Sequence, residues 1–223
     1  MKKYKIYPSL VDSFKLFTKF DFISFEEIID RINRVPRPTP EPALKGIALE
    51  NCVNDLLSGK KIETDFLKKS GSIIKSYVTQ AENKKFLVPV ETIDFIVERL
   101  WGAEMQVFAK ADLKTPVGLV EIYGYSDYVL RDTVTDLKGI SSQYSWPKYL
   151  NNCQHKTYLY CLNENGIKVN RAEYLITDFT NIYVEDYYWS LKMKTELIGD
   201  IAQFVAFLET HRDKITNKKI FGE

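Results

Sequence analysis

The stretch that decides the fold reads GYSDYVLRDTVTDLKG and covers residues 124–139. It predicts two short strands, with Asp127 at the head of the first and with Asp136 and Lys138 closing the second. Side chains on a strand alternate between its two faces, so Asp136 and Lys138 share one face. If the strands pair as a hairpin, Asp127 lies beside Asp136, and the backbone carbonyl of Leu137 reaches the same side.

These residue types point to one kind of chemistry. Two neighbouring carboxylates repel each other and resist joint ionisation unless a cation lies between them. Oxygen ligands of this kind favour Mg²⁺ or Mn²⁺ over softer metals. A lysine beside such a cation can orient or deprotonate a water molecule, or stabilise negative charge on a phosphate. A carboxylate pair with a lysine around a hard cation is what hydrolysis of a phosphodiester requires.

Outside this stretch the sequence alternates between helical and strand patterns. Apolar residues at helical spacing predict helices over residues 9–19, 25–35, 42–57, 147–163 and 191–211, the second opened by a capping box of Ser24 and Glu27. Runs of β-branched and aromatic residues predict strands over 104–113, 117–125, 126–132, 133–139, 171–179 and 182–190, the first four as an antiparallel meander. Residues 60–100 form a less distinct helical stretch, and the prolines from Pro36 to Pro42 predict an extended connection. This order predicts a mixed α/β fold.

Composition limits the classes of protein to consider. The 223 residues carry 31 Lys and Arg against 30 Asp and Glu, which gives a formal charge of +1 and excludes a polyanion-binding surface over the whole protein. Cys52, Cys153 and Cys161 form no CxxC pair and lie in apolar patterns, so we expect small core residues in a reducing environment. No stretch approaches the roughly 20 apolar residues that span a bilayer. The sequence therefore predicts a cytoplasmic protein without a membrane partner.

Four segments resemble, in order, the motifs of the PD-(D/E)XK nuclease superfamily in its RecB-like and phage-lambda-type exonuclease branches. They are GIALE at residues 46–50, GYSD at 124–127, VTDLK at 134–138 and QHKTY at 154–158. The opening YPSL at residues 7–10 is similar to a start that is common in RecB-like nucleases. The motifs cover about residues 43–162, and they fall on the predicted helix, strand pair and helix in the order that the family has.

The resemblance implies a restriction-endonuclease-like core, with a mixed central β-sheet flanked by helices, in a single nuclease domain over residues 1–223. In this division residues 1–41 hold the N-terminal helices and the proline-rich loop, 42–190 the nuclease core and 191–223 the C-terminal helix. It also implies the roles of the site residues: Glu50, Asp127, Asp136 and the Leu137 carbonyl bind Mg²⁺ or Mn²⁺, Lys138 is catalytic, and Gln154 and Tyr158 support the site. Glu50 stands where the RecB helicase-linked pattern has a histidine. The four cysteines of the CRISPR-associated relatives are missing from the sequence, so no iron–sulfur cluster is expected.

Aromatic and basic residues follow the third motif. Residues 139–162 contain no acidic residue. Lysines neutralise phosphates and aromatic rings stack on bases, so this stretch is a candidate nucleic-acid groove. Its candidate contacts are Tyr144, Trp146, Lys148 and Lys156. The alternative is that the aromatic residues cover an edge of the sheet.

Two arginines and two histidines complete the candidates. Arg34 and Arg37 flank the start of the proline-rich loop and could meet a terminal phosphate, or they could be solvated loop residues. His155 and His211 are expected at surface or capping positions rather than as metal ligands.

The sequence favours a metal-dependent deoxyribonuclease, an exonuclease acting on DNA ends in bacterial or phage recombination or repair. DNA is the expected partner, whereas an annealing protein, a helicase and an oligomeric state are left open. One alternative is an endonuclease for restriction or branched DNA with the same active site. Another is a nucleic-acid-binding protein that keeps the fold without turnover.

Overall fold

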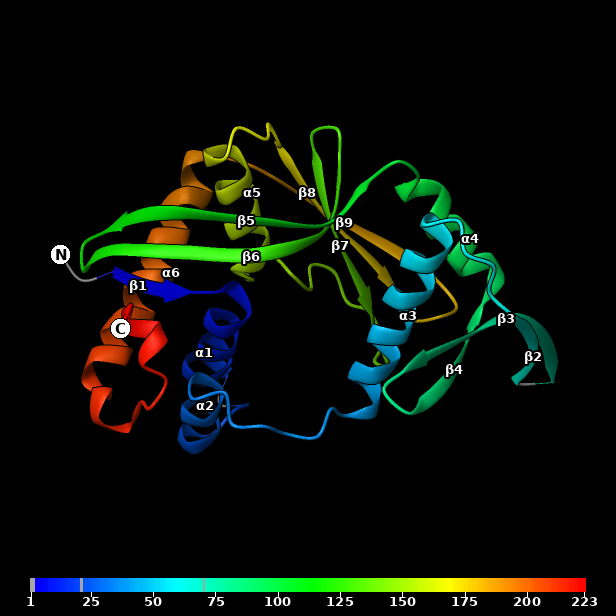
Figure 1. Ribbon diagram of the computed structural model, residues 1–223, viewed down its shortest axis with the longest axis horizontal. Helices are drawn as coiled ribbons and strands as arrows, with labels where there is room; N and C mark the ends of the chain where they lie inside the picture. Colours follow the sequence, from blue (N-terminus) through cyan, green and yellow to red (C-terminus); the bar gives the residue numbers. More distant parts are fainter. Residues whose placement is uncertain (1–2, 21, 70) are drawn as a thin grey trace.

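The computed structural model describes residues 3–20, 22–69 and 71–223. In this part of the chain a six-stranded sheet has the order β1-β6-β7-β8-β9, and β5 pairs with β6. The pairs β1–β6 and β7–β8 are parallel, and the other pairs are antiparallel. The strands are β1 (Lys3–Ile6), β5 (Glu104–Thr115), β6 (Gly118–Leu130), β7 (Thr133–Gly139), β8 (Arg171–Thr177) and β9 (Ile182–Tyr188). This mixed central sheet, flanked by helices, confirms the predicted α/β fold class (Figure 1).

The helices form two groups at opposite ends of the molecule (Figure 1). One group contains α1 (Pro8–Phe20), α2 (Phe25–Ile32), α5 (Gln154–Glu164) and α6 (Leu191–Thr210), and its core includes Ile28, Leu159 and Phe204. The other contains α3 (Glu41–Leu57) and α4 (Val90–Leu100), whose core includes Leu49, Ile93 and Leu175. The capping box of Ser24 and Glu27 opens α2 as predicted. Residues 35–40 join the two groups as an extended segment, which confirms the prediction from the prolines.

The expected helical stretch over residues 60–100 is wrong. A second sheet of β2 (Thr64–Lys69), β3 (Ser72–Ala81) and β4 (Lys84–Pro89) occupies most of it, and only α4 is helical. Gly71 and Glu82 lie in the turns that join these strands, and both residues have a positive φ. Because β3 has polar residues on both faces, its alternation is weak, and the sequence does not distinguish it from an irregular helix.

Two other boundaries differ from the prediction. The strands expected over 117–125 and 126–132 are one continuous strand, β6, so Asp127 lies within it and not at a strand head. The helix expected from Pro147 begins only at Gln154, because two side chains of α1 bond the backbone just before it. Asp12 accepts from the N–H of Cys153, and Lys15 donates to the carbonyl of Asn151, so neither group is free for a helical hydrogen bond.

The structure places the three cysteines and the two histidines that the sequence singles out. Cys52, Cys153 and Cys161 are buried free thiols, as predicted. His155 is buried with its ring stacked 4.5 Å from that of Tyr187, so the expectation of a surface or capping position is wrong for it. His211 does cap the C-terminus of α6. Among the described residues, no helix is both long and apolar enough to cross a membrane. The short helices η1 (Arg212–Lys214) and η2 (Lys218–Phe221) follow α6.

Candidate active site

The site lies where one edge of β6 loses its strand partner. Along this edge β1 pairs with Leu119–Ile122 of β6, and β7 pairs with Tyr128–Leu130. Neither strand pairs with residues 123–127 between them. This splayed edge holds Asp127, and Oδ2 of Asp127 accepts a hydrogen bond from the backbone N–H of Leu137 on β7 at 3.0 Å. The separation of β1 and β7 therefore leaves the part of β6 that carries the second motif without a strand partner on this edge.

Asp136 is the centre of the contacts at this edge. Its carboxylate is 4% exposed, with Oδ2 at 2.5 Å from Nζ of Lys138 and Oδ1 accepting from Nε2 of Gln154 at 2.6 Å. The same nitrogen of Gln154 donates to the hydroxyl of Tyr158 at 3.0 Å. Asp136 and Lys138 thus share one face, as the strand alternation predicts. The structure brings the third motif and the Gln-xxx-Tyr segment of α5 into direct contact.

Two glycines of the 124–139 stretch have packing roles. A Cβ on Gly124 would lie 2.9 Å from Cε1 of Tyr158, closer than real contacts allow. A Cβ on Gly139 would meet Phe179 at 3.0 Å, and Cα of Gly46 lies 3.4 Å from its position. Glycine at 124 therefore lets α5 approach β6, and glycine at 139 lets α3 approach β7. These approaches bring the helices that carry Gln154 and Glu50 close to the strands.

Glu50 approaches the same site from α3. Its Oε1 accepts from Nε2 of Gln106 at 2.7 Å. Burial raises the pKa of Glu50, and the charge of Asp136 raises it further. Burial raises the pKa of Asp127 to about 8, with the charges of Asp136 and Glu50 adding to the rise. The three carboxylates therefore interact with one another electrostatically, although they come from three different elements.

The chemistry of these donors fits a hard divalent cation, whose charge would relieve their repulsion. As the side chains stand, however, no three His, Cys, Asp or Glu residues in the described ranges are close enough to hold a metal ion. Glu50 is turned to Gln106, and the ammonium of Lys138 is the charge partner of Asp136. Binding a cation at this site thus requires these two side chains to rearrange.

Lys138 is a cation in this arrangement. Burial alone lowers the pKa of its ammonium, but the charges of Asp136 and Asp127 outweigh burial and hold that pKa above its usual range. A lysine that keeps its proton can stabilise negative charge on a phosphate oxygen or orient a water molecule. As arranged here, it is not suited to accept a proton.

Hydrogen bonds to Glu185 on β9 anchor the segment after β7, which is the candidate nucleic-acid groove. This carboxylate is 2% exposed and accepts from the hydroxyls of Tyr144 and Tyr187 at 2.8 and 2.5 Å, and from the backbone N–H groups of Lys148 and Tyr149 at 2.7 and 3.0 Å. Three of these donors, from Tyr144, Lys148 and Tyr149, belong to the segment and make it rigid, while Tyr187 lies on β9 itself. The sequence alone does not single out Glu185, because this residue lies on β9, 36 residues beyond Tyr149 and 41 beyond Tyr144.

The candidate nucleic-acid residues of this segment divide into two groups. Trp146 is 75% exposed, and Lys148 is exposed with Nζ near the hydroxyl of Ser142. Tyr144 is stacked on Tyr183 of β9 at 4.3 Å, so it covers the sheet as the alternative reading has it. Lys156 is buried and pairs with Glu196 at 2.8 Å, so its expected contact with nucleic acid is wrong. Helix α5 turns Lys156 toward α6 and away from the surface.

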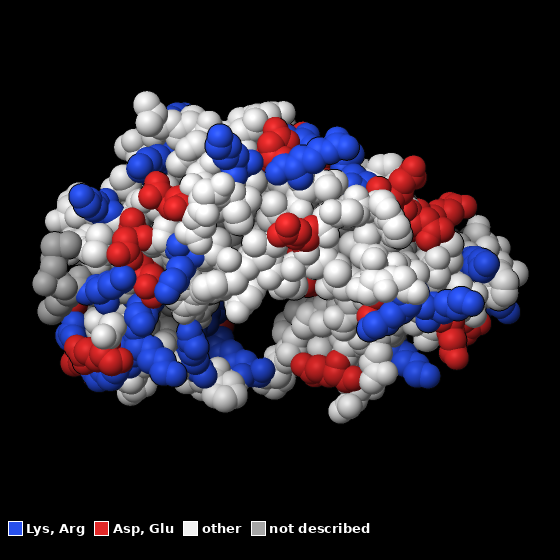
Figure 2. All heavy atoms as spheres, turned by 45° about the horizontal axis from the view of Figure 1, so that its top comes forward, with Lys and Arg blue, Asp and Glu red and all other residues white. Residues whose placement is uncertain are grey.

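The two arginines of the proline-loop region also differ. Arg37 forms ion pairs with Glu27 at 3.2 Å and Asp30 at 3.0 Å, which occupy its guanidinium. Arg34 instead lies against Tyr7 and Tyr123. Figure 2 shows a hollow between the two halves of the molecule, with Lys and Arg side chains gathered beside it. Of the two arginines, Arg34 is therefore the one that is available to an anionic ligand.

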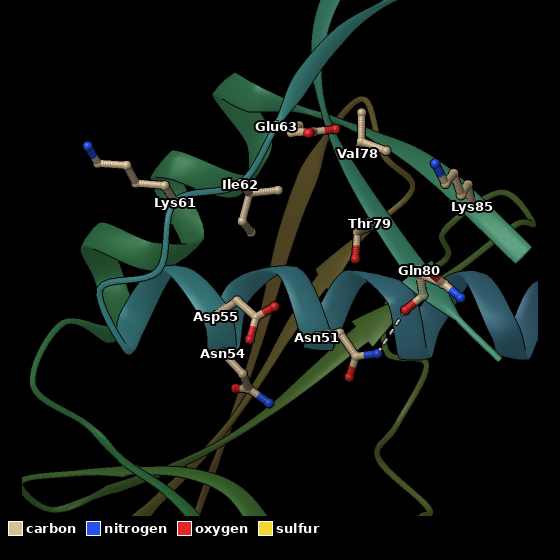
Figure 3. A pocket seen from close by; sticks show the side chains of 10 residues that line it. All are labelled: Asn51, Asn54, Asp55, Lys61, Ile62, Glu63, Val78, Thr79, Gln80 and Lys85. Carbon is tan, nitrogen blue, oxygen red and sulfur yellow. Dashed lines mark hydrogen bonds between the residues drawn. The ribbon is translucent and has the colours of Figure 1, made fainter. Parts of the chain in front are cut away.

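A separate hollow lies between α3 and β3, outside the site that the motifs predict (Figure 3). Its volume is about 450 Å³, and Asn51, Asp55, Lys61, Glu63 and Lys85 are among its lining residues. Nδ2 of Asn51 donates to the carbonyl of Gln80 at 2.9 Å. Asp127, Asp136 and Lys138 do not line it, so we assign it no part in the chemistry.

Comparison with known proteins supports the fold. No protein-family model matches the chain, and no curated protein matches it. The structure of a putative exonuclease from Eubacterium rectale is similar to this chain over 92% of its length and 81% of that protein, with a TM-score of 0.50 and 11% identity. A protein named SSO0001 matches with a TM-score of 0.41 and 14% identity. The match covers 52% of this chain and 55% of SSO0001. The Eubacterium rectale structure thus shares the mixed α/β architecture of this chain.

Proposed function

We propose that this protein is a metal-dependent nuclease that hydrolyses phosphodiester bonds, and that it acts as an exonuclease on DNA ends. The single observation that carries the proposal is the convergence on Asp136 of Lys138 at 2.5 Å and Gln154 at 2.6 Å, beside Asp127 on the splayed edge of β6. The architecture shared with the Eubacterium rectale protein supports a nuclease, but at 11% identity it bears on the fold alone. A role in DNA recombination or repair rests on the motif resemblance.

Each site residue has a role in the proposed reaction. Glu50, Asp127, Asp136 and the Leu137 carbonyl would hold Mg²⁺ or Mn²⁺, which supplies a Lewis acid and activates water when bound. Lys138 stabilises the negative charge that builds on the phosphate. Gln154 fixes the orientation of the Asp136 carboxylate, and Tyr158 fixes Gln154.

The test uses end-labelled linear duplex DNA beside a closed circular duplex, with Mg²⁺, Mn²⁺ or EDTA. We compare wild type with Lys138→Ala and with Lys110→Ala, an exposed lysine on β5 of the same sheet. We expect metal-dependent loss of the linear substrate alone, abolished in Lys138→Ala and retained in Lys110→Ala. Unchanged cleavage by Lys138→Ala would contradict the assignment of the site, and cutting of the closed circle would show an endonuclease.

A further inference from the structure

Arg34 has a backbone conformation that normally favours glycine. Its φ is +57°, in the left-handed region, and it follows Asn33, the C-cap of α2. Its N–H donates to the carbonyl of Arg31 at 3.2 Å, and the N–H of Val35 donates to that of Asp30 at 2.9 Å. Glycine is the usual residue at this position of such a helix end, because it has no Cβ to strain. An arginine at this position carries backbone strain that glycine would avoid.

The side chain of Arg34 is exposed and placed by two tyrosines. Its Cζ lies 5.5 Å from the centre of the Tyr7 ring, and its Nη2 donates to the hydroxyl of Tyr123 at 3.3 Å. The two tyrosine rings are 6.1 Å apart. In the described part of the chain no carboxylate forms an ion pair with Arg34, unlike Arg37. The positive charge of Arg34 is thus oriented but not neutralised.

Three cavities of the described structure adjoin one another at Arg34 and Tyr7, since both residues line all three. The first, of about 280 Å³, reaches Tyr125, Gln154 and Tyr158 at the candidate active site. The second, of about 470 Å³, reaches Ser13, Arg31 and Arg37. The third, of about 460 Å³, reaches Lys5 and Lys219 on the far side. Its one acidic lining residue, Glu223, is paired with Arg212 at 2.5 Å.

We propose that the first and third cavities form a track for a single-stranded polynucleotide that leads away from the catalytic residues. In this proposal, which rests on the proposed function, a backbone phosphate binds Arg34, and bases pack against Tyr7, Tyr123 and Tyr125. Phosphates farther along the strand approach Lys5 and Lys219. Ring faces stack on unpaired bases, whose faces are free, whereas the bases of a duplex are already stacked on one another. The track therefore selects a single strand over a duplex.

Glycine substitution separates binding from folding. Arg131, in the turn between β6 and β7, is also exposed with a positive φ of 56°, which makes it a matched control. Glycine suits both backbones, so Arg34→Gly and Arg131→Gly should unfold at the same temperature as wild type or higher. A loss of binding in Arg34→Gly alone then reports on the side chain.

The experiment measures fluorescence anisotropy of a labelled oligothymidylate in EDTA at several salt concentrations. One arm uses the strand with a 5′-phosphate, one the strand with a 5′-hydroxyl, and one a duplex of equal length. We expect Arg34→Gly to weaken binding of both single strands about tenfold and to lower the salt slope by about 0.7. Arg131→Gly should bind like wild type.

Three outcomes would overturn the track. They are equal binding by Arg34→Gly and wild type, an effect confined to the duplex, and an effect confined to the 5′-phosphorylated strand, which would show a terminal-phosphate site instead. Because EDTA prevents metal-dependent cleavage, binding to the track is measured separately from cleavage. If wild type cleaves no DNA but its binding depends on Arg34, the track stands and the nuclease assignment fails.

Discussion

The carboxylate of Asp127 accepts a hydrogen bond from the backbone N–H of Leu137 at 3.0 Å, at the point where β6 and β7 stop pairing. Beside it, Tyr128 and Thr135 form the last pair of the ladder between these strands. The carboxylate of Asp127 thus accepts the hydrogen bond that a backbone carbonyl of β6 would accept if the ladder continued. This contact sets Asp136 beside β6. The same carboxylate has its pKa raised to about 8 by burial and by the charges of Asp136 and Glu50. Asp127 therefore joins the strands, and without a cation it holds its proton up to about pH 8, because a further negative charge beside Asp136 and Glu50 is unfavourable.

Asp127→Asn should keep the fold and lose the response to metal. The amide oxygen can still accept from Leu137, but the negative charge that favours a cation is gone. At a hundredfold excess of Mg²⁺ over its Kd, we expect the wild-type Tm to rise by roughly 5–10 °C. Circular dichroism melts with Mg²⁺ and with EDTA measure the rise, and Asp132→Asn, at the turn of the same hairpin, is the control. An equal rise in Asp127→Asn would remove this residue from the metal site.

Gly124→Ala should disturb the site through Tyr158. The new methyl group would lie 2.9 Å from the ring of Tyr158, whose hydroxyl accepts from Gln154. We expect a loss of about 1–3 kcal/mol in stability from overpacking and a fall of about 100-fold in cleavage rate from misplaced groups. Gly199→Ala, on α6 with no atom within 4 Å of the new Cβ, should instead stabilise by about 0.5–1 kcal/mol and cleave normally. Urea unfolding and single-turnover rates measure both, and a normal rate in Gly124→Ala would refute the role of this contact.

His155 should make stability fall in acid. Burial lowers its pKa from 6.5 to about 3, so the folded protein keeps this ring neutral. Between pH 6.5 and pH 3 the unfolded chain binds a proton here that the folded chain does not. Its contribution to stability is therefore complete above pH 6.5 and falls by about 1.4 kcal/mol for each pH unit below that value, until pH 3. Denaturant unfolding at several pH values should show that the free energy of unfolding depends less steeply on pH in His155→Asn than in wild type. Parallel slopes for His155→Asn and wild type would contradict this account.

Lys148 should contribute to the salt dependence of DNA binding, whereas Lys156 should not. Lys156→Met leaves Glu196 without its partner, but that carboxylate is exposed, so stability should change by at most about 1 kcal/mol, and the salt dependence of DNA binding should stay unchanged. Lys148→Ala removes an exposed charge, so it should leave Tm unchanged and lower the salt slope by about 0.7–0.9. Thermal melts and binding at several salt concentrations measure both effects. A reduced salt slope in Lys156→Met would restore the role that the sequence predicts for it.

Trp146 should stack on a base of the bound substrate. It is 75% exposed on a segment that Glu185 holds rigid, so little conformational entropy is lost when a base packs on it. We expect Trp146→Ala to bind single-stranded DNA about tenfold more weakly, and Glu185→Gln to weaken binding by loosening the segment. Trp101→Ala, which removes a tryptophan that is 68% exposed on α4's end, should bind normally. Normal binding by Trp146→Ala would leave this segment without a role in recognition.

Local geometry explains what could be predicted for the site. The strand period places Asp136 and Lys138 on one face, and the helix period places Gln154 and Tyr158 one turn apart. Both pairs are in contact because neither depends on distant parts of the chain. The helices that open at Ser24 and near Pro42 are likewise set by caps and prolines within a few residues.

Contacts between distant segments decided the rest. Lys156 has the surroundings of a surface lysine in the sequence, but α6 supplies Glu196 and buries it. Residues 147–153 have a helical pattern, but Asp12 and Lys15 of α1 bond the backbone at Cys153 and Asn151. The sequence by itself therefore determined the fold class and the local pairs of the site, because 2.0- and 3.6-residue periods act over a few residues. Only the tertiary structure decided that Gln106 meets Glu50 and that Arg34 lies between Tyr7 and Tyr123, because those contacts join segments that local periodicity does not relate.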